Sequence, residues 1–140
     1  AAAAQECACF NFRKASRAIS KLYDDTLQPI GLRSTQFVTL LAIYLNEPIA
    51  LSALSREMVA DRSTLTRNLN VLERDGVIRS KPGRGRVRLY SLTEKGRRIL
   101  ADGIPLWEKA QGRFVEQLGG KHWSGMLSGL DAAVRAAKQA

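Results

Sequence analysis

The chain is poor in the residues that cross-link small folds, and it has no long apolar run. Its 140 residues include four prolines, one histidine and two cysteines, and aromatic residues make up 6%. Because Cys7 and Cys9 are two residues apart, no disulfide framework can join distant segments, which indicates a reducing compartment. No run approaches the roughly 18 apolar residues of a membrane span, and the N-terminus shows no signal-peptide pattern. We therefore expect a cytoplasmic protein without a membrane partner.

Motifs that carry catalysis or hold phosphate are also lacking. No serine and aspartate can be grouped with His122, the single histidine, by any recognisable pattern, and there is no HExxH sequence. Gly83 and Gly85 fall in an expected hairpin loop and not in a strand-to-helix phosphate loop. We therefore expect no enzyme activity, no cofactor and no metal.

What the sequence has in excess is positive charge, and it lies in one segment. There are 22 basic and 13 acidic residues, a net charge of +9, in a chain that is 45% hydrophobic. Residues 51–98 hold 12 basic and 5 acidic residues, whereas each flanking segment holds 5 and 4. A concentrated positive segment is typical of proteins that bind a polyanion. This favours nucleic acid over the alternative, a basic surface with no such partner.

Hydrophobic periodicity predicts a mainly α-helical fold with one small β-hairpin. In chain order, we expect helices over 8–27, 34–45, 52–59 and 61–75, strands over 77–78 and 87–92 around a loop at 81–86, a helix from 93 to 118 and a last helix after 120. Ser34 and Asp61 are the expected N-caps of their helices, and Gly76 ends the helix that Asp61 begins. Pro105 is expected to kink or break the long helix.

This order of elements indicates a winged helix-turn-helix. We expect a single domain over 5–140, in which residues 32–98 form the winged helix-turn-helix lobe. Residues 5–31 and 99–140 form a helical dimerisation lobe, because its helices are too apolar for so small a central lobe to cover. A second copy of the chain is the simplest partner, so we expect a homodimer. Trp107 is interpreted as a core or dimer contact, with the lining of a ligand pocket as the alternative.

The helix over 61–75 has the composition of a DNA recognition helix. Leu65, Leu69 and Leu72 point inward, and no acidic residue interrupts 62–72. Arginine pairs with guanine edges, asparagine with adenine, and serine or threonine with phosphates or bases. The predicted DNA-binding residues of this helix are Arg62, Ser63, Thr64, Thr66, Arg67 and Asn70. The alternative interpretation is an ordinary solvated helix.

The expected hairpin adds a second basic group next to this helix. Its predicted DNA-binding residues are Arg84, Arg86 and Arg88, which accompany two glycines at the tip. Arginines on a flexible tip suit a narrow minor groove, whose negative potential attracts guanidinium groups. The alternative is a loose basic loop without a partner.

The ordered set of local motifs resembles the MarR (multiple antibiotic resistance regulator) family over roughly residues 8–118. The segments that carry the resemblance are 51–55 (LSALS), 61–67 (DRSTLTR), 72–78 (LERDGVI) and 92–96 (LTEKG). The resemblance implies a homodimer with interleaved terminal helices, bound to a pseudo-palindromic operator in double-stranded DNA. It also implies repression relieved by a small ligand or an oxidant. Arg86 matches the family's wing arginine, whereas Arg84 stands where the family has an acid.

The segment Cys9-Phe10, with Ser16-Arg17 and Tyr23, resembles the organic-hydroperoxide-sensing branch of that family. This implies a redox sensor at Cys9 whose thiol is hydrogen-bonded by Tyr23, although two further sensor tyrosines of the branch fall at Arg13 and Ser34. The alternatives are a small apolar residue in the dimer interface and a thiophilic metal or arsenic site. Because Cys7 and Cys9 on one helix would face nearly opposite sides, we expect no bond between them unless that end is unwound.

The sequence thus predicts a sequence-specific DNA-binding transcription regulator, a dimeric repressor released by a small ligand. One alternative is a thiol-based oxidant-sensing repressor that uses Cys9. Another is a winged-helix module that binds protein, for which any DNA binding would depend little on salt.

Overall fold

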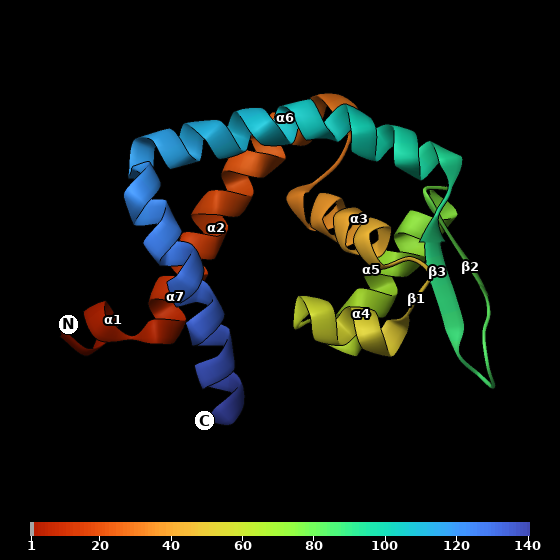
Figure 1. Ribbon diagram of the computed structural model, residues 1–140, viewed down its shortest axis with the longest axis horizontal. Coiled ribbons are helices and arrows are strands. Elements are labelled where there is room, and N and C mark those ends of the chain that lie inside the picture. Colours follow the sequence, from red (N-terminus) through yellow and green to blue (C-terminus); the bar gives the residue numbers. More distant parts are fainter. Residues whose placement is uncertain (1) are drawn as a thin grey trace. The chain divides into compact units, whose positions relative to one another are not determined.

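The computed structural model describes residues 2–140, which form mostly helices, with a small antiparallel sheet and short connecting loops (Figure 1). In chain order the elements are α1 (Ala2–Glu6), α2 (Ala8–Leu27), η1 (Gln28–Ile30), α3 (Ser34–Asn46), β1 (Ile49–Ala50), α4 (Leu51–Met58), α5 (Arg62–Arg74), β2 (Ile78–Pro82), β3 (Arg88–Leu92), α6 (Glu94–Leu118) and α7 (Gly120–Gln139). The predicted fold class, a mainly α chain with a winged helix-turn-helix, is confirmed. Within the described residues no helix is both long and apolar enough to cross a membrane.

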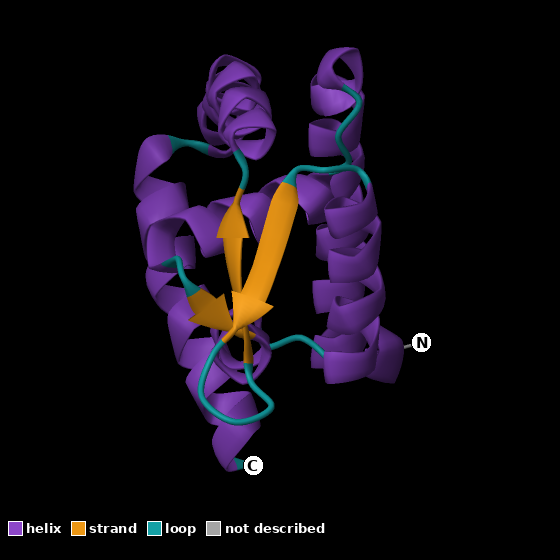
Figure 2. Cartoon of the chain, turned by 90° about the vertical axis from the view of Figure 1, so that its right-hand side faces the viewer, coloured by secondary structure: helices purple, strands orange, loops and turns teal. Residues whose placement is uncertain are grey.

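The sheet contains one strand more than the sequence predicts. Its order is β1-β3-β2, and Figure 2 shows the hairpin loop projecting beyond the strand ends. β1 is only two residues long and pairs Ile49 with Tyr90. β2 continues to Pro82 and not only to Ile78, because pairing with β3 outweighs the low strand propensity of its charged residues. A strand of two residues is too short to show an alternation of apolar and polar side chains, so the sequence gives no sign of β1.

The chain divides into two compact units, one ending at Trp107 and one spanning Glu108–Ala140. The first unit holds the hydrophobic core. Phe37 from α3, Leu54 from α4 and Ile78 from β2 are each at most 2% exposed. Leu65, Leu69 and Leu72 of α5 are buried in the same cluster, as their spacing predicts. This burial fixes which face of α5 points outward.

The second unit consists of the end of α6 and the whole of α7. The Phe114 and Trp123 rings meet edge to face, with centroids 5.4 Å apart and planes 89° apart. No residue of α7 is buried in the chain. Beyond Trp123, the apolar residues Met126, Leu127, Leu130 and Val134 of α7 stay exposed.

One predicted N-cap is wrong, and one of the two effects expected of Pro105 does not occur. Pro105 does not break the long helix, because α6 continues on both sides of it and Ile104, Leu106 and Trp107 pack against the core. Ser34 is not the N-cap of α3; that position belongs to Arg33. The Ser34 N–H is instead satisfied by Asp24 of α2, whose Oδ1 accepts it at 2.6 Å. This hydrogen bond lowers the pKa of the Asp24 carboxyl below its usual value.

The start of α6 is joined to the end of α5 by the segment Thr93–Gly96. The Thr93 hydroxyl donates to the Gly76 carbonyl at 2.7 Å, and the Thr93 N–H donates to the Val77 carbonyl at 3.1 Å. Lys95 Nζ adds a bond to the Asp75 carbonyl at 2.9 Å. A Cβ at position 96 would lie 1.9 Å from the Val77 carbonyl oxygen, so only glycine fits there. The LTEKG motif therefore fixes the end of α5.

Candidate nucleic-acid interface

The outward face of α5 presents the side chains that the sequence predicts. Arg62, Ser63, Thr64, Arg67 and Asn70 are exposed, whereas Thr66 is half-buried. Ser63, Arg67 and Asn70 are spaced by four and three residues, so they share the side opposite the buried leucines. These three residues form the centre of the face.

The first turn of α5 is held in place by its N-cap. Asp61 Oδ2 accepts the Thr64 N–H at 3.0 Å and the Thr64 hydroxyl at 3.2 Å. Arg67 Nη2 in turn lies 3.3 Å from Thr64 Oγ1, to which it donates. The bond from the Thr64 backbone is the main reason why the pKa of the Asp61 carboxyl is lowered. The guanidinium of Arg67 is thereby oriented before any ligand arrives.

Two residues of α5 differ from the predicted set. The Thr66 hydroxyl donates to the Arg62 carbonyl of its own helix at 2.7 Å, so its proton is already used. Arg74 is exposed and lies on the same face as Arg67 and Asn70, although the prediction omits it. The three- and four-residue spacing from Asn70 and Arg67 could have found it. The basic face of α5 therefore extends to the end of the helix.

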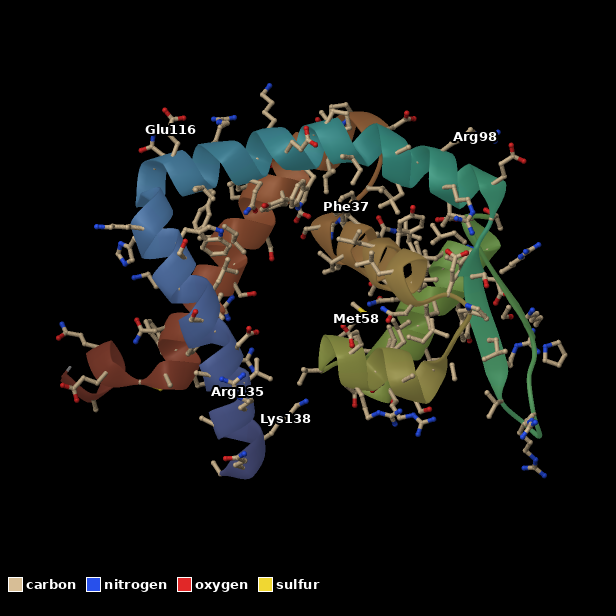
Figure 3. The ribbon with its side chains drawn as sticks, viewed as in Figure 1. Phe37, Met58, Arg98, Glu116, Arg135 and Lys138 are labelled. Carbon is tan, nitrogen blue, oxygen red and sulfur yellow. The ribbon has the colours of Figure 1, made fainter. Side chains whose placement is uncertain are left out.

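The tip of the hairpin is shorter than predicted and rich in arginine. The loop is closed by two backbone bonds, from Gly83 N–H to the Val87 carbonyl at 2.7 Å and from Val87 N–H to the Arg84 carbonyl at 3.2 Å. Arg84 and Arg86 are exposed there, and Figure 3 shows nitrogen-bearing side chains around the tip. Together with the outward face of α5, this tip, residues 83–87, forms the candidate interface.

Arg88 lies at the base of the hairpin, where it has partners within the chain. Its Nε and Nη2 donate to Ser80 Oγ at 3.1 and 2.7 Å, and Ser80 Oγ donates to Glu73 Oε2 at 2.7 Å. Arg88 therefore differs from Arg84 and Arg86, for which no such bond is seen in the described residues.

A groove of about 270 Å³ lies between α2, α3 and the middle of α6. Its apolar wall includes Ile19, Val38 and Trp107, together with Phe37, which Figure 3 labels on α3. Tyr23 also lines it, and burial raises the pKa of this phenol above its usual value. The geometry agrees with both interpretations of Trp107, which packs against the core and also lines this groove. The groove can hold a small apolar molecule that carries one or two hydrogen-bonding groups.

The two cysteines lie near the start of α2, but not on one helix as predicted. Cys7 is the N-cap between α1 and α2, and its Sγ accepts the Phe10 N–H at 3.4 Å. Cys9 is helical, and both thiols are exposed in the chain. Tyr23 is 14 residues further along α2, which is about 21 Å at 1.5 Å per residue. The expected hydrogen bond between Cys9 and Tyr23 therefore cannot form within one chain.

Among residues 2–140 no three or more histidine, cysteine or acidic side chains come together as metal ligands do. A group of basic residues on one helix and one hairpin tip, with little acid beside it, is suited to contacts with an anionic polymer.

Comparisons with known proteins agree with this geometry. A profile of the MarR family matches residues 32–84. The M. tuberculosis transcriptional regulator MosR, solved in complex with DNA, is 37% identical, and the match covers 96% of this chain and 98% of MosR at a TM-score of 0.88. A second crystal structure of MosR matches over the same shares of the two chains at 36% identity and a TM-score of 0.86.

The HTH-type transcriptional regulator SarZ of Staphylococcus epidermidis is 37% identical over 93 residues, which are 65% of this chain. That match spans 63% of SarZ, less than two thirds of its length. MosR, in contrast, matches from end to end at more than a third identity. The chain therefore belongs to the MarR family of transcriptional regulators.

Proposed function

We propose that this protein regulates transcription by binding specific sequences of double-stranded DNA. The observation that carries the proposal is the outward face of α5. Exposed arginine, serine and asparagine side chains lie there, on a helix whose leucines are buried in the core. The solved complex of MosR with DNA supports it. We assign the protein to the cytoplasm, where its DNA would lie, and we assign it no catalytic activity.

In this proposal α5 enters the major groove and the hairpin tip reaches the neighbouring minor groove. Arg67 reads a guanine edge and Asn70 an adenine edge, while Ser63 and Thr64 contact phosphates or bases near the helix start. Arg62 and Thr66 flank this row. Arg84 and Arg86 enter the minor groove, with Arg88 behind them at the base of the hairpin.

The test compares two single substitutions on duplexes selected from a random-sequence library by the parent protein. Arg67→Ala should weaken binding and relax base preference at one position, because it removes a base contact. Arg84→Ala should weaken all sequences about equally and reduce the slope of log affinity against log salt by about one. Arg113→Ala, an exposed arginine of the second unit, is the matched control. Fluorescence anisotropy gives both quantities, and parent-like behaviour of both variants contradicts the assignment.

We propose further that the protein acts as a homodimer built from its terminal helices. In the first unit Phe10 and Phe12 of α2 are about half exposed, and in the second unit four apolar residues of α7 are 39–47% exposed: Met126, Leu127, Leu130 and Val134. Such stripes are seldom left in water. Two copies would place two α5 helices about 34 Å apart, one turn of DNA, on a pseudo-palindromic operator.

Sedimentation velocity tests the dimer. We expect the parent chain to sediment as a dimer at micromolar concentration, and Leu127→Asp to shift it towards the monomer by burying an unpaired carboxylate. Asp131→Asn, on the same helix, is the control. A parent that stays monomeric would contradict the proposal.

The groove lined by Trp107 and Tyr23 is the proposed site of a releasing ligand, which makes the protein a repressor. Because Phe37 in the groove wall belongs to the same buried cluster as the leucines of α5, a molecule bound there can favour one arrangement of the core over another. In the variant Trp123→Phe the emission of Trp107 reports binding alone. Small aromatic compounds that quench it should also displace the duplex; quenching without displacement contradicts release.

A second candidate is an oxidant-sensing repressor that uses Cys9, and the exposure of that thiol favours it. An organic hydroperoxide would transfer one oxygen to the thiolate, giving a sulfenic acid and an alcohol. Tyr23 could reach Cys9 only from the second copy, given their separation on α2. Peroxide should release DNA from the parent but not from Cys9→Ser. Equal release from both ends this candidate.

A further inference from the structure

Three side chains connect the base of the hairpin to the last turn of α5. Ser80 on β2 donates its single hydroxyl proton to Glu73 Oε2 and accepts two bonds from the Arg88 guanidinium on β3. Each of these hydrogen bonds has one donor and one acceptor. The Arg88 guanidinium and the Glu73 carboxylate are therefore joined through the Ser80 hydroxyl.

The three residues lie on both sides of the turn at Gly76, which separates α5 from β2. Gly76 has φ 77°, a left-handed conformation, and it ends α5 two residues before β2 begins. The bond between Glu73 and Ser80 crosses this bend. Backbone bonds close the end of α5 at this bend, from the Gly76 N–H to the Glu73 carbonyl at 3.0 Å and from the Val77 N–H to the Leu72 carbonyl at 3.1 Å. The bond from Ser80 adds a restraint further along β2, closer to the tip of the hairpin.

The charges of Glu73 and Arg88 also indicate that these side chains act together. Glu73 is the first acidic residue after Asp61 along α5, and it is exposed beside a face that we assign to phosphate-lined DNA. A free carboxylate there would repel DNA. Arg88 compensates that charge through Ser80, and this contact takes up two of the five N–H groups of its guanidinium.

We propose that Glu73, Ser80 and Arg88 form a positioning site that sets the angle between α5 and the hairpin. Arg88 acts through Ser80 and does not bind phosphate directly. The inference rests on the proposed function and adds to it. Contacts in the major and minor grooves stay in register because this site fixes the hairpin relative to α5.

The first test removes the hydroxyl while keeping every cation. We expect Ser80→Ala to weaken binding of the selected duplex by about twofold to thirtyfold, the usual range for a coupling residue outside the contact surface. The slope of log affinity against log salt should not change. Ser91→Ala is the matched control. Ser80 pairs with Tyr90, so these two side chains share one face of the sheet, and Ser91, the next residue of β3, faces the other side. Affinity equal to the parent, or higher because Arg88 is released, overturns the proposal.

The second test removes the cation. For a positioning role, Arg88→Ala weakens binding with an unchanged salt slope, and the double variant Ser80→Ala/Arg88→Ala is no weaker than the worse single variant. A direct phosphate contact instead lowers the slope by about one, as we expect for Arg84→Ala. That result overturns the proposal, and so does strict additivity of the two substitutions.

The third test needs no DNA and so separates this inference from the proposed function. Hydrogen–deuterium exchange of the intact protein should be faster in Ser80→Ala than in Ser91→Ala at the amides of β2 and at the end of α5. Equal exchange in both variants overturns the positioning site even where DNA binding is intact. If the parent binds no duplex, the proposed function fails, and the exchange experiment still decides whether the three residues restrain the hairpin.

Discussion

The substitution Gly96→Ala gives a sharp test of how α6 is joined to the end of α5. A methyl group at this position would lie 1.9 Å from the Val77 carbonyl oxygen and 3.0 Å from its carbon, where ordinary contacts begin near 3.4 Å. Both neighbours are backbone atoms, so no side-chain rotation relieves the clash. The start of α6 must therefore move away from Val77, and the hydrogen bond from the Thr93 N–H to the Val77 carbonyl is lost.

Overpacking of this kind costs about 1–3 kcal/mol, and a lost backbone hydrogen bond adds about 1 kcal/mol. The expected loss of about 2–4 kcal/mol corresponds to a fall in Tm of roughly 6–12 °C for a chain of this size. Thermal unfolding followed by circular dichroism at one fixed protein concentration measures it. Gly112→Ala is the control: it lies in the same helix with nothing within 4 Å, and should raise stability by up to about 1 kcal/mol. A Tm for Gly96→Ala within a degree of the parent would refute the close approach.

Two other predictions concern α5 itself. Because the pKa of its N-cap Asp61 is lowered, the stabilising effect of this carboxylate is present above the ordinary carboxyl pKa and is lost as the pH falls through the lowered native value. The Tm values of Asp61→Ala and the parent should therefore differ at neutral pH and converge in acid. A difference that persists in acid would point to another cause. Leu69→Ala should lose about 2–5 kcal/mol because Leu69 is fully buried, whereas Asn70→Ala should unfold like the parent but bind DNA less well. Urea unfolding and anisotropy on both variants separate the two effects, and equal stabilities would show that the inward and outward faces are misassigned.

The parts of the fold that the sequence predicted well are those with strong periodicity or a strong terminal residue. The spacing of Leu65, Leu69 and Leu72 fixed the orientation of α5, and Asp61 and Gly76 mark its two ends as expected. Helix α2 has the predicted bounds for the same reason, because one apolar stripe runs through all of it.

The features that the sequence did not predict depend on contacts between distant segments. β1 exists only because β3 lies beside it, and α6 passes through Pro105 because tertiary packing outweighs one missing hydrogen bond. Asp24 accepts the N–H of Ser34, the first residue of α3, from ten residues away. In the candidate interface, the outward face of α5 and the arginines of the tip follow from spacing. The bonds of Arg88 do not, because they need the register that pairs Ser80 with Tyr90.

The two backbone bonds that close residues 83–87 have a consequence for how such regulators diverge. No core residue lies in this loop, so insertions, deletions and changes of charge there leave the buried cluster intact. A lineage can therefore alter its preference for flanking DNA sequence by changing a few loop codons, while the leucines beneath α5 keep the central half-site unchanged.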